Sequence, residues 1–417
     1  MPRASCQNVA SNRKARPIPY NRHFLTATGI VATLVLAHSM LSFALPLLAL
    51  DISGTGTGLA LIKGAGFIPN ILFAVFVGVI NDRMRKATGF RLYTLLLAAS
   101  CAILWAMMLA DRVNIASLVI FVIFLNAVGY ALGNLQFTLL RLTVPDDRLS
   151  DATALNSAIN ATITTIGPAV GGFTLLTLGS TGLVGIVTLI LLANAVAAFT
   201  VNPDETLPPP SPFWPSLREG FAVFAKNREL VMMTIAVILT NAAAGAFIVG
   251  LLLKLKTQLG ANDFETGLVV AAAGVGSVIA ATYAPRIRRH IGYRAAFFWP
   301  IWLLALLSLA TAAAPTLLIL FIISFLEGAV SIFYDIGIWS YRQESTAAAH
   351  MGRVAGITGA IFKLGMPPVI FLAGWLADAD ALTSVFLLST GLFVGAALFL
   401  SLVAGWGLPR RATFTKA

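Results

Sequence analysis

Long apolar runs alternate with short polar segments along almost the whole chain. The polar segments carry most of the charged residues, and the runs between them hold very few. The twelve runs cover residues 24–50, 59–80, 91–110, 115–138, 153–177, 182–201, 230–253, 264–285, 295–314, 316–340, 354–377 and 383–407. An apolar run of about 20 residues is long enough to cross the hydrocarbon core of a bilayer as one helix. The pattern therefore predicts an all-α membrane protein with twelve transmembrane helices.

The composition excludes the other common classes of protein. Hydrophobic residues make up 58% of the chain and charged residues only 11%, against roughly 25% charged residues in an ordinary soluble domain. So much apolar surface is incompatible with a soluble globular protein, and equally with a disordered chain. Cys6 and Cys101 are the only cysteines, which excludes a small disulfide-stabilised scaffold.

The positions of the 28 Lys and Arg residues predict the orientation in the membrane. With a cytoplasmic N-terminus, 23 of them lie in cytoplasmic segments, three in outer loops and two inside spans. Basic residues concentrate on the cytoplasmic side of membrane proteins, so both termini are expected in the cytoplasm. The net charge of +11 is explained by this orientation, and no nucleic-acid partner is expected.

The longest polar stretch, residues 202–229, lies in the middle of the chain. It begins PDETLPPPSPFWPS, and its prolines exclude a helix interior there. Leu217, Phe221 and Phe224 then follow at i, i+4 and i+7, which predicts a short amphipathic helix on the inner membrane surface. The expected divisions are a cytoplasmic N-terminal tail, a six-helix half, a central loop, a second six-helix half and a C-terminal tail. They cover residues 1–23, 24–201, 202–229, 230–407 and 408–417.

The two halves resemble one another in sequence. The fifth run carries GPAVGG at residues 167–172, and the eleventh carries GMPP at residues 365–368, about 200 residues later. Duplicated six-helix halves are typical of transporters, whose site lies near the bilayer midplane between the halves. A pseudo-symmetric pair of halves is therefore expected.

Motifs for catalysis and for cofactor or metal binding are missing from the sequence. It contains no GxxxxGK[ST] phosphate loop and no nucleophile elbow, and its four histidines and two cysteines lack the spacing of metal ligands. The glycine-rich run GTGTG at residues 54–58 has no strand before it and is interpreted as an outer loop. We therefore expect neither an enzyme nor a bound cofactor.

Four ionisable residues lie inside the apolar runs: Lys63, Glu327, Asp335 and Lys363. Each costs roughly 2.5–3.5 kcal/mol at the centre of a membrane helix, so they are expected to face a cavity or one another. Glu327 lies near the middle of its span and is the first candidate for proton coupling, with Asp335 and His38 after it. The alternative is a fixed ion pair of Glu327 with Lys363 that has only a structural role.

Polar residues at helical spacing provide further candidates for a substrate cavity. Asn126 and Tyr130 are one turn apart in the fourth span, and Asn156 and Asn160 are one turn apart in the fifth. The full set of cavity candidates is Lys363, Lys63, Asn126, Tyr130, Asn156, Asn160, Asn241, Ser331 and Tyr334. The alternative for these side chains is helix-to-helix hydrogen bonding, and Lys63 has the further alternative of extending to the outer interface.

Two motifs resemble those of the major facilitator superfamily. In the loop GVINDRMRK, Gly78, Asp82, Arg83 and Lys86 match the family's gating loop GxxxDRxGRK, although Arg85 replaces its second glycine. The fifth span matches GPxxGG, a motif of members that export by antiport, through Gly167, Pro168, Gly171 and Gly172. The fourth-span motif RxxQG is absent, so a proton role for its arginine does not carry over to this chain.

Longer segments are similar to the branch that contains the enterobactin exporter and macrolide efflux pumps. These are VPDDRLSDATALNSAINATITTIGPAVGG, LREGFAVFAKNREL and GRVAGITGAIFKLGMPPVIFLAGWLAD. The resemblance implies a monomeric secondary transporter of the bacterial cytoplasmic membrane. It would export a small organic molecule, a siderophore or a drug-like compound, by alternating access driven by protons. Lys63 and Lys363 favour a carboxylate-rich siderophore over a cationic drug. The alternative is an importer of an organic acid or a sugar.

Overall fold

The computed structural model describes residues 22–145, 148–202, 205 and 213–406. The expected tails, apart from residues 22 and 23, lie outside these ranges. Every regular element within them is helical. The helices are α1 (Arg22–Ser53), α2 (Gly56–Ala65), α3 (Ile68–Leu72), α4 (Ala74–Arg83), α5 (Lys86–Leu109), α6 (Ile115–Thr143), α7 (Leu149–Ala197), α8 (Phe213–Lys226), α9 (Arg228–Leu253), α10 (Asp263–Ala313), α11 (Leu317–Ser345), α12 (Ala348–Ile361), α13 (Met366–Asp378) and α14 (Leu382–Ala404). Helices suit a membrane, because they satisfy their own backbone hydrogen bonds in lipid.

The described ranges contain nine helical segments that are long and apolar enough to cross a membrane. Two of them, α7 and α10, each join two helices at a glycine with positive φ: Gly179 at +66° and Gly292 at +78°. Only glycine adopts this conformation without strain. The short helices α2, α3 and α4 follow one another as one interrupted passage. With α7 and α10 counted twice, the described helices accommodate the twelve spans that the sequence predicts.

Two of the passages are interrupted near their middle. Between α2 and α3 lie Gly66 and Phe67, and Pro69 follows in the first turn of α3. Between α12 and α13 the chain reads FKLG and continues with Pro367 and Pro368. Proline has no N–H to continue a helix, so a break precedes each proline segment. Lys63 and Lys363 therefore lie beside helix breaks.

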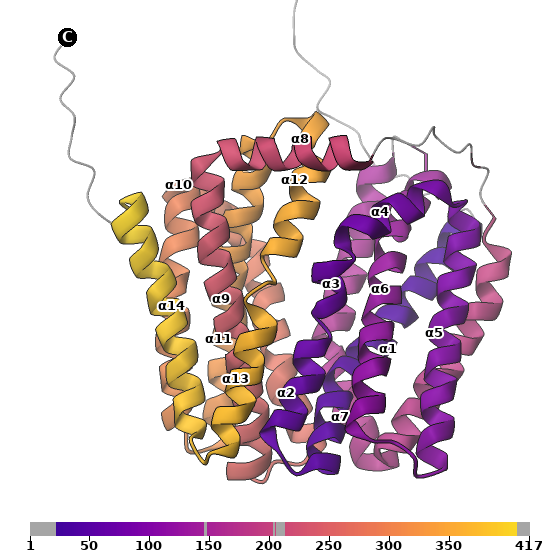
Figure 1. Ribbon diagram of the computed structural model, residues 1–417, viewed down its shortest axis with the longest axis horizontal. Coiled ribbons are helices and arrows are strands. Elements are labelled where there is room, and N and C mark those ends of the chain that lie inside the picture. The colour runs from indigo at the N-terminus through magenta and orange to yellow at the C-terminus, as the bar shows by residue number, and fades with distance from the viewer. Residues whose placement is uncertain (1–21, 146–147, 203–204, 206–212, 407–417) are drawn as a thin grey trace, which may run out of the picture.

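The helices form two groups that lie side by side (Figure 1). Helices α1–α7 make up one group and α9–α14 the other, and α8 lies across one end of the molecule. We call this the α8 end and the opposite one the far end. Helix α8 rests on α12: Gly220 packs against Arg353, and Glu219 forms an ion pair with Arg353 and lies 3.3 Å from His350 Nδ1.

Helix α8 occupies the position where the sequence predicts an amphipathic helix. Of its three predicted apolar residues, Phe224 is buried, Leu217 is half-buried and Phe221 is 53% exposed. The helix thus presents part of its apolar surface to the protein and part to the surroundings. Its location on the inner membrane surface stays a prediction.

The two groups of helices pack most tightly at the far end. Gly56 of α2 lies against Ala377 and Asp378 of α13, and Gly374 of α13 lies against Ala60 of α2. Small residues let the backbones of membrane helices come close together. The resulting van der Waals packing holds the helices together, because lipid supplies no hydrophobic driving force between them. The far end of the interface is therefore closed in this structure.

A cluster of polar and aromatic side chains joins α9 to α10 at the α8 end. Glu229 accepts a hydrogen bond from Arg294 at 2.8 Å and one from Tyr293 at 3.0 Å. The hydrogen bond to Glu229 raises the pKa of Arg294, and burial together with Glu229 raises the pKa of Tyr293. Trp406 lies edge-on to Tyr293 with ring centroids 6.5 Å apart. These contacts fix the loop at Gly292 within one group of helices.

Candidate functional site

Three cavities meet at His38 of α1. The largest has a volume of about 450 Å³ and extends along α1 from Leu41 to Val31, towards the α8 end. Two smaller ones, each of about 230 Å³, lie on the far-end side of His38 and share Ser42 and Lys63. Cavities of a few hundred Å³ are of the size that binds small organic molecules. One of the smaller cavities is walled by both groups of helices, since Thr164 and Ile248 both line it.

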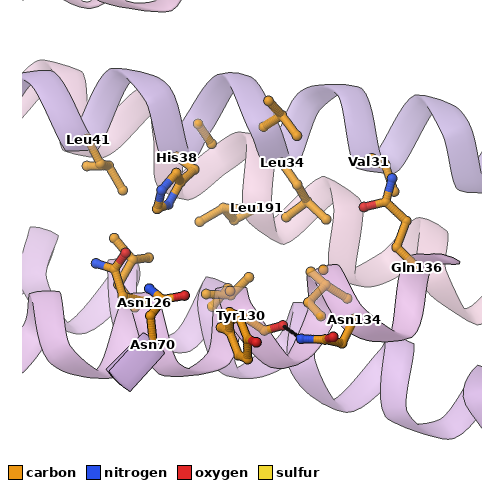
Figure 2. Close-up of a pocket in the computed structure, with 17 residues that line it drawn as sticks. Val31, Leu34, His38, Leu41, Asn70, Asn126, Tyr130, Asn134, Gln136 and Leu191 are labelled. Carbon is orange, nitrogen blue, oxygen red and sulfur yellow. Dashed lines mark hydrogen bonds between the residues drawn. The ribbon is translucent and has the colours of Figure 1, made fainter. Parts of the chain in front are cut away.

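Uncharged polar side chains line one wall of the largest cavity. Asn126, Tyr130 and Asn134 follow one another at every fourth residue of α6, and Asn70 of α3 lies beside Asn126 (Figure 2). His38 points at this wall from α1, across the cavity. The sequence predicted Asn126 and Tyr130 but missed Asn70, Asn134 and Gln136. Continuing the four-residue spacing from Tyr130 identifies Asn134, whereas only the break between α2 and α3 brings Asn70 to the site.

Lys63 lies at the far-end side of His38, in the last turn of α2. Its ammonium donates a hydrogen bond of 3.3 Å to the backbone oxygen of Ser42. Among the described residues, no Asp or Glu forms an ion pair with it. The sequence allowed two positions for this lysine, in a cavity or at the outer interface. In the structure it lines two cavities.

The predicted acidic residues belong to the other group of helices. Glu327 is half-buried on the face of α11 that also carries buried Ser324 and Gly328. Neither Glu327 nor Asp335 lines the three cavities at His38. Within the described part of the chain, Glu327 and Lys363 form no ion pair with one another. The fixed ion pair that the sequence left as an alternative is thus not observed in the described structure.

Several predicted cavity residues make hydrogen bonds within or between helices instead. Tyr334 is buried, stacks on Phe297 with centroids 4.8 Å apart, and bonds to Thr240 at 2.5 Å. The side-chain amide of Asn241 donates a hydrogen bond of 2.9 Å to the backbone oxygen of Phe362, at the helix break after α12. Ser331 donates to Gly328 of its own helix at 3.0 Å.

The two asparagines of the fifth span lie closer to the α8 end. Asn156 is buried and lines a small space between α1, α6 and α7. Asn160 has a buried Oδ1 atom with no hydrogen-bond partner in the described structure. An unpaired buried acceptor is costly unless water or a ligand supplies a donor, so Asn160 keeps its place among the candidate residues.

The glycines of the GPxxGG segment make close contacts at the far end. A Cβ atom at Gly167 would overlap the side chain of Ser39, and one at Gly171 would lie 3.3 Å from Met40 Cα. Gly172 faces the other group of helices, where a Cβ atom would overlap the backbone oxygen of Asp263. Gly172 is therefore required for the approach of α7 to α10 at the interface.

The gating-loop residues are only partly described. Lys86 is buried and pairs with Glu205 at 3.5 Å, and its ammonium donates to the carbonyl oxygen of Asn81 at 2.8 Å. Arg83 is exposed. The side chain of Asp82 and the environment of Gly78 lie outside the described structure. Lys86 thus anchors the loop to the segment that follows the sixth predicted span.

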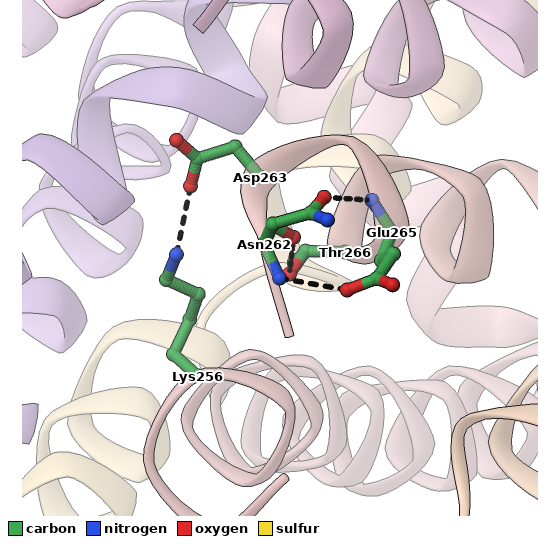
Figure 3. A network of polar contacts seen from close by, with 5 residues as sticks. All are labelled: Lys256, Asn262, Asp263, Glu265 and Thr266. Carbon is green, nitrogen blue, oxygen red and sulfur yellow. Dashed lines mark hydrogen bonds and ion pairs between the residues drawn. The ribbon is translucent and has the colours of Figure 1, made fainter. Parts of the chain in front are cut away.

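A polar network lies at the far end beside Gly172. Lys256 and Asp263 form an ion pair of 2.8 Å, and Asn262 and Glu265 cap the start of α10 reciprocally (Figure 3). On the other side of the interface, the carboxylate of Asp378 accepts hydrogen bonds from the backbone N–H groups of Gly56 and Thr57 at 2.5 and 3.0 Å. Asp378 therefore caps a helix of the other group.

Several solved membrane transporters have a similar fold. The nucleoside transporter NupG aligns with a TM-score of 0.72 at 12% identity, over 91% of this chain and 99% of that one. The POT family transporter PepTSo aligns with a TM-score of 0.75 at 11% identity, over 93% and 98%. A bacterial homologue of the iron transporter ferroportin, in an inward-facing state, gives 0.73 at 13% identity, over 91% and 97%. At these identities the likeness concerns the fold alone.

Sequence comparison gives the family. The multidrug efflux pump Tap of Mycolicibacterium fortuitum is 25% identical over 377 residues, which are 82% of this chain and 86% of Tap. The MFS-type transporter y4rN of Sinorhizobium fredii is 26% identical over 371 residues, 84% of this chain and 85% of y4rN. Residues 28–368 match the family model described as Major Facilitator Superfamily. The chain is therefore a multi-pass membrane transporter and no enzyme, and it belongs to the Major Facilitator Superfamily.

Proposed function

We propose that this transporter is a proton-coupled exporter of a small organic molecule. The observation that carries the proposal is the group of cavities at His38, one of which is walled by both groups of helices. Tap, which is similar over 82% of the chain, is a multidrug efflux pump, and this supports the outward direction. The GPxxGG segment that the sequence shares with antiporting exporters lies at the closed far end.

Transport proceeds by alternating access in this proposal. Residues 24–201 and 230–407 form two halves that rock about the cavities at His38. The α8 end is the cytoplasmic side, as the distribution of basic residues predicts. The structure is then closed towards the outside, at Gly172 and Gly374, and the largest of the three cavities at His38 extends towards the cytoplasm. This is the state that takes up substrate from the cell.

Glu327 is the proposed proton carrier, with Asp335 on the same helix as the second group. Both carboxyl groups lie on a membrane helix, and neither is engaged in an ion pair in the described structure. A carboxyl group without a fixed counter-charge is free to exchange a proton between the two states. Neither acid lines the cavities at His38, so that proton and substrate need not compete for one site.

Efflux from cells tests the direction of transport. The chain is expressed in a host that lacks its own efflux pumps, and the accumulation of a panel of fluorescent and drug-like compounds is measured with and without a protonophore. Export predicts lower accumulation of at least one compound, restored by the protonophore. Higher accumulation on expression would contradict export and support the importer alternative.

A Glu327→Gln variant tests the coupling. We expect it to bind substrate but to lose uphill export driven by a proton gradient in inverted membrane vesicles, because glutamine carries no exchangeable acidic proton. Glu344→Gln provides the matched control, since Glu344 is an exposed acid at the end of the same helix. Uphill export by the Glu327→Gln protein at the wild-type rate would remove Glu327 as the coupling site.

A further inference from the structure

Lys63 and His38 place basic groups, without any acid, at the point where the three cavities meet. His38 lines all three of them, and Lys63 lines the two on the far-end side. The lining residues of these cavities in the described structure include no Asp and no Glu. From this arrangement we infer that the substrate is an organic anion with a single acid group on an apolar body, and that the acid binds at Lys63. The inference rests on the proposed transport function, because it names the substrate class of the same cavity.

The hydrogen bonding of Lys63 leaves most of its donors available. An ammonium has three N–H donors, and the contact with the backbone oxygen of Ser42, at 3.3 Å, is its one hydrogen bond in the described structure. A charge in the membrane interior is costly unless a counter-charge or several hydrogen bonds offset that cost. A carboxylate on the substrate supplies both the charge and the acceptors. A cationic substrate would instead add a second positive charge beside the ammonium.

The rest of the cavity determines how many charges the substrate carries. Beyond His38, the wall formed by α1 is apolar, with Val31, Leu34 and Leu41, and the opposite wall offers uncharged amide and hydroxyl groups (Figure 2). One anchoring cation and apolar walls fit a molecule with one charged end. A polycarboxylate would leave its further charges against leucine and valine side chains, which costs several kcal/mol for each unpaired ion. From the sequence, Lys63 and Lys363 favoured a carboxylate-rich siderophore as the substrate. The lining of the cavity disfavours such a substrate.

The position of Lys63 relative to the helix break gives it access to both halves of the transporter. It lies in the last turn of α2, three residues before Gly66, and lines a cavity together with Ile248 and Leu252 of α9. Lys363, the other lysine inside a predicted span, does not line the three cavities at His38. The acid-binding role is accordingly assigned to Lys63 and not to Lys363.

Binding to the purified, full-length protein in detergent tests the inference without any need for transport. Four probes of related shape are compared by thermal shift and microscale thermophoresis: naphthoate, neutral naphthamide, cationic naphthylmethylammonium and polyanionic benzenetetracarboxylate. We expect naphthoate to bind at least about tenfold more tightly than the other three, as a charged hydrogen bond predicts. Equal or tighter binding of the cation or of the polyanion would overturn the inference, and so would an absence of naphthoate binding up to its solubility limit.

Substitutions then locate the acid group. Lys63→Gln should weaken the binding of naphthoate about tenfold and leave the binding of naphthamide unchanged, so that the preference for naphthoate is lost. Lys63→Arg keeps the positive charge and should retain most of that preference. Lys254→Gln is the matched control, because Lys254 is also buried and donates to a backbone oxygen, that of Ala312 at 2.7 Å, away from the cavities. An unchanged preference in a folded Lys63→Gln protein would contradict the assignment. Should the anion bind at Lys63 while no compound is exported from cells, the proposed export fails and the anion site remains.

Discussion

The ammonium of Lys86 lies 3.5 Å from the carboxylate of Glu205, and both side chains are almost completely buried. The same carboxylate accepts a hydrogen bond of 2.6 Å from the backbone N–H of Lys86. Lys86 belongs to the loop GVINDRMRK, and Glu205 lies 119 residues later, just after the sixth predicted span. A residue of the central segment thus fixes the gating loop of the first group of helices.

Removal of Glu205 should strongly destabilise the protein. A Glu205→Ala substitution leaves the Lys86 charge buried and unpaired, which costs about 3–5 kcal/mol when one partner of a buried pair is lost. Thermal unfolding in detergent, followed by size-exclusion chromatography, measures the effect. Glu344→Ala is the control, because Glu344 pairs with Arg288 but is 56% exposed, and its loss should change the melting temperature little. Equal effects of the two substitutions would contradict the buried pair.

A methyl group at Gly172 should prevent closure of the far end. The Cβ atom of a Gly172→Ala protein would overlap the backbone oxygen of Asp263, and neither backbone has room to move within packed helices. We expect folded protein with transport reduced about fivefold or more, as overpacking costs about 1–3 kcal/mol. Gly391→Ala is the control, because a Cβ atom there meets nothing within 4 Å. Wild-type transport by the Gly172→Ala protein would show that the far end closes differently.

The Asp378 carboxylate should stabilise the closed far end across the interface. Loss of a helix cap costs about 0.5–2 kcal/mol, so Asp378→Ala should shift the protein towards the outward-open state. The shift is measured with Ser42→Cys as a reporter in a Cys6→Ser, Cys101→Ala background. Its reaction with a membrane-impermeant thiol reagent added outside should accelerate about fivefold, the factor that corresponds to about 1 kcal/mol.

Asp378→Asn serves as the internal comparison for the cap. It retains one acceptor oxygen, so its labelling rate should fall between those of the wild-type and Asp378→Ala proteins. Labelling that is unchanged in the Asp378→Ala protein would show that the contacts with Gly56 and Thr57 do not hold the far end closed.

The hydroxyl group of Tyr334 should contribute to stability rather than to substrate binding. It is buried, bonds to Thr240 and does not line the cavities at His38. A Tyr334→Phe substitution removes that bond and keeps the stacking on Phe297, so we expect a loss of about 0.5–1.5 kcal/mol in stability. Transport rate per folded molecule should not change. A loss of transport without a loss of stability would return Tyr334 to the substrate site.

The sequence by itself determined the helical membrane fold and the family. Apolar runs of membrane-spanning length leave only helices as a solution in lipid, and the motifs at Asp82 and at Gly167–Gly172 indicated the superfamily that residues 28–368 match. The amphipathic helix of the central segment also followed from periodicity, since Leu217, Phe221 and Phe224 recur at helical spacing. Such features depend on neighbours in the chain, which is why a pattern reveals them.

Only the tertiary structure decided which polar residues share a cavity. Lys63, Glu327 and Lys363 looked equivalent as charges inside apolar runs, yet Lys63 alone of the three lines the cavities at His38. The break between α2 and α3 brings Asn70 to the largest of these cavities, whereas Asn241 donates a hydrogen bond to the backbone oxygen of Phe362. These outcomes depend on how helices rotate and break against partners more than a hundred residues away. Spacing along the chain fixes the face of one helix, but packing decides what that face meets.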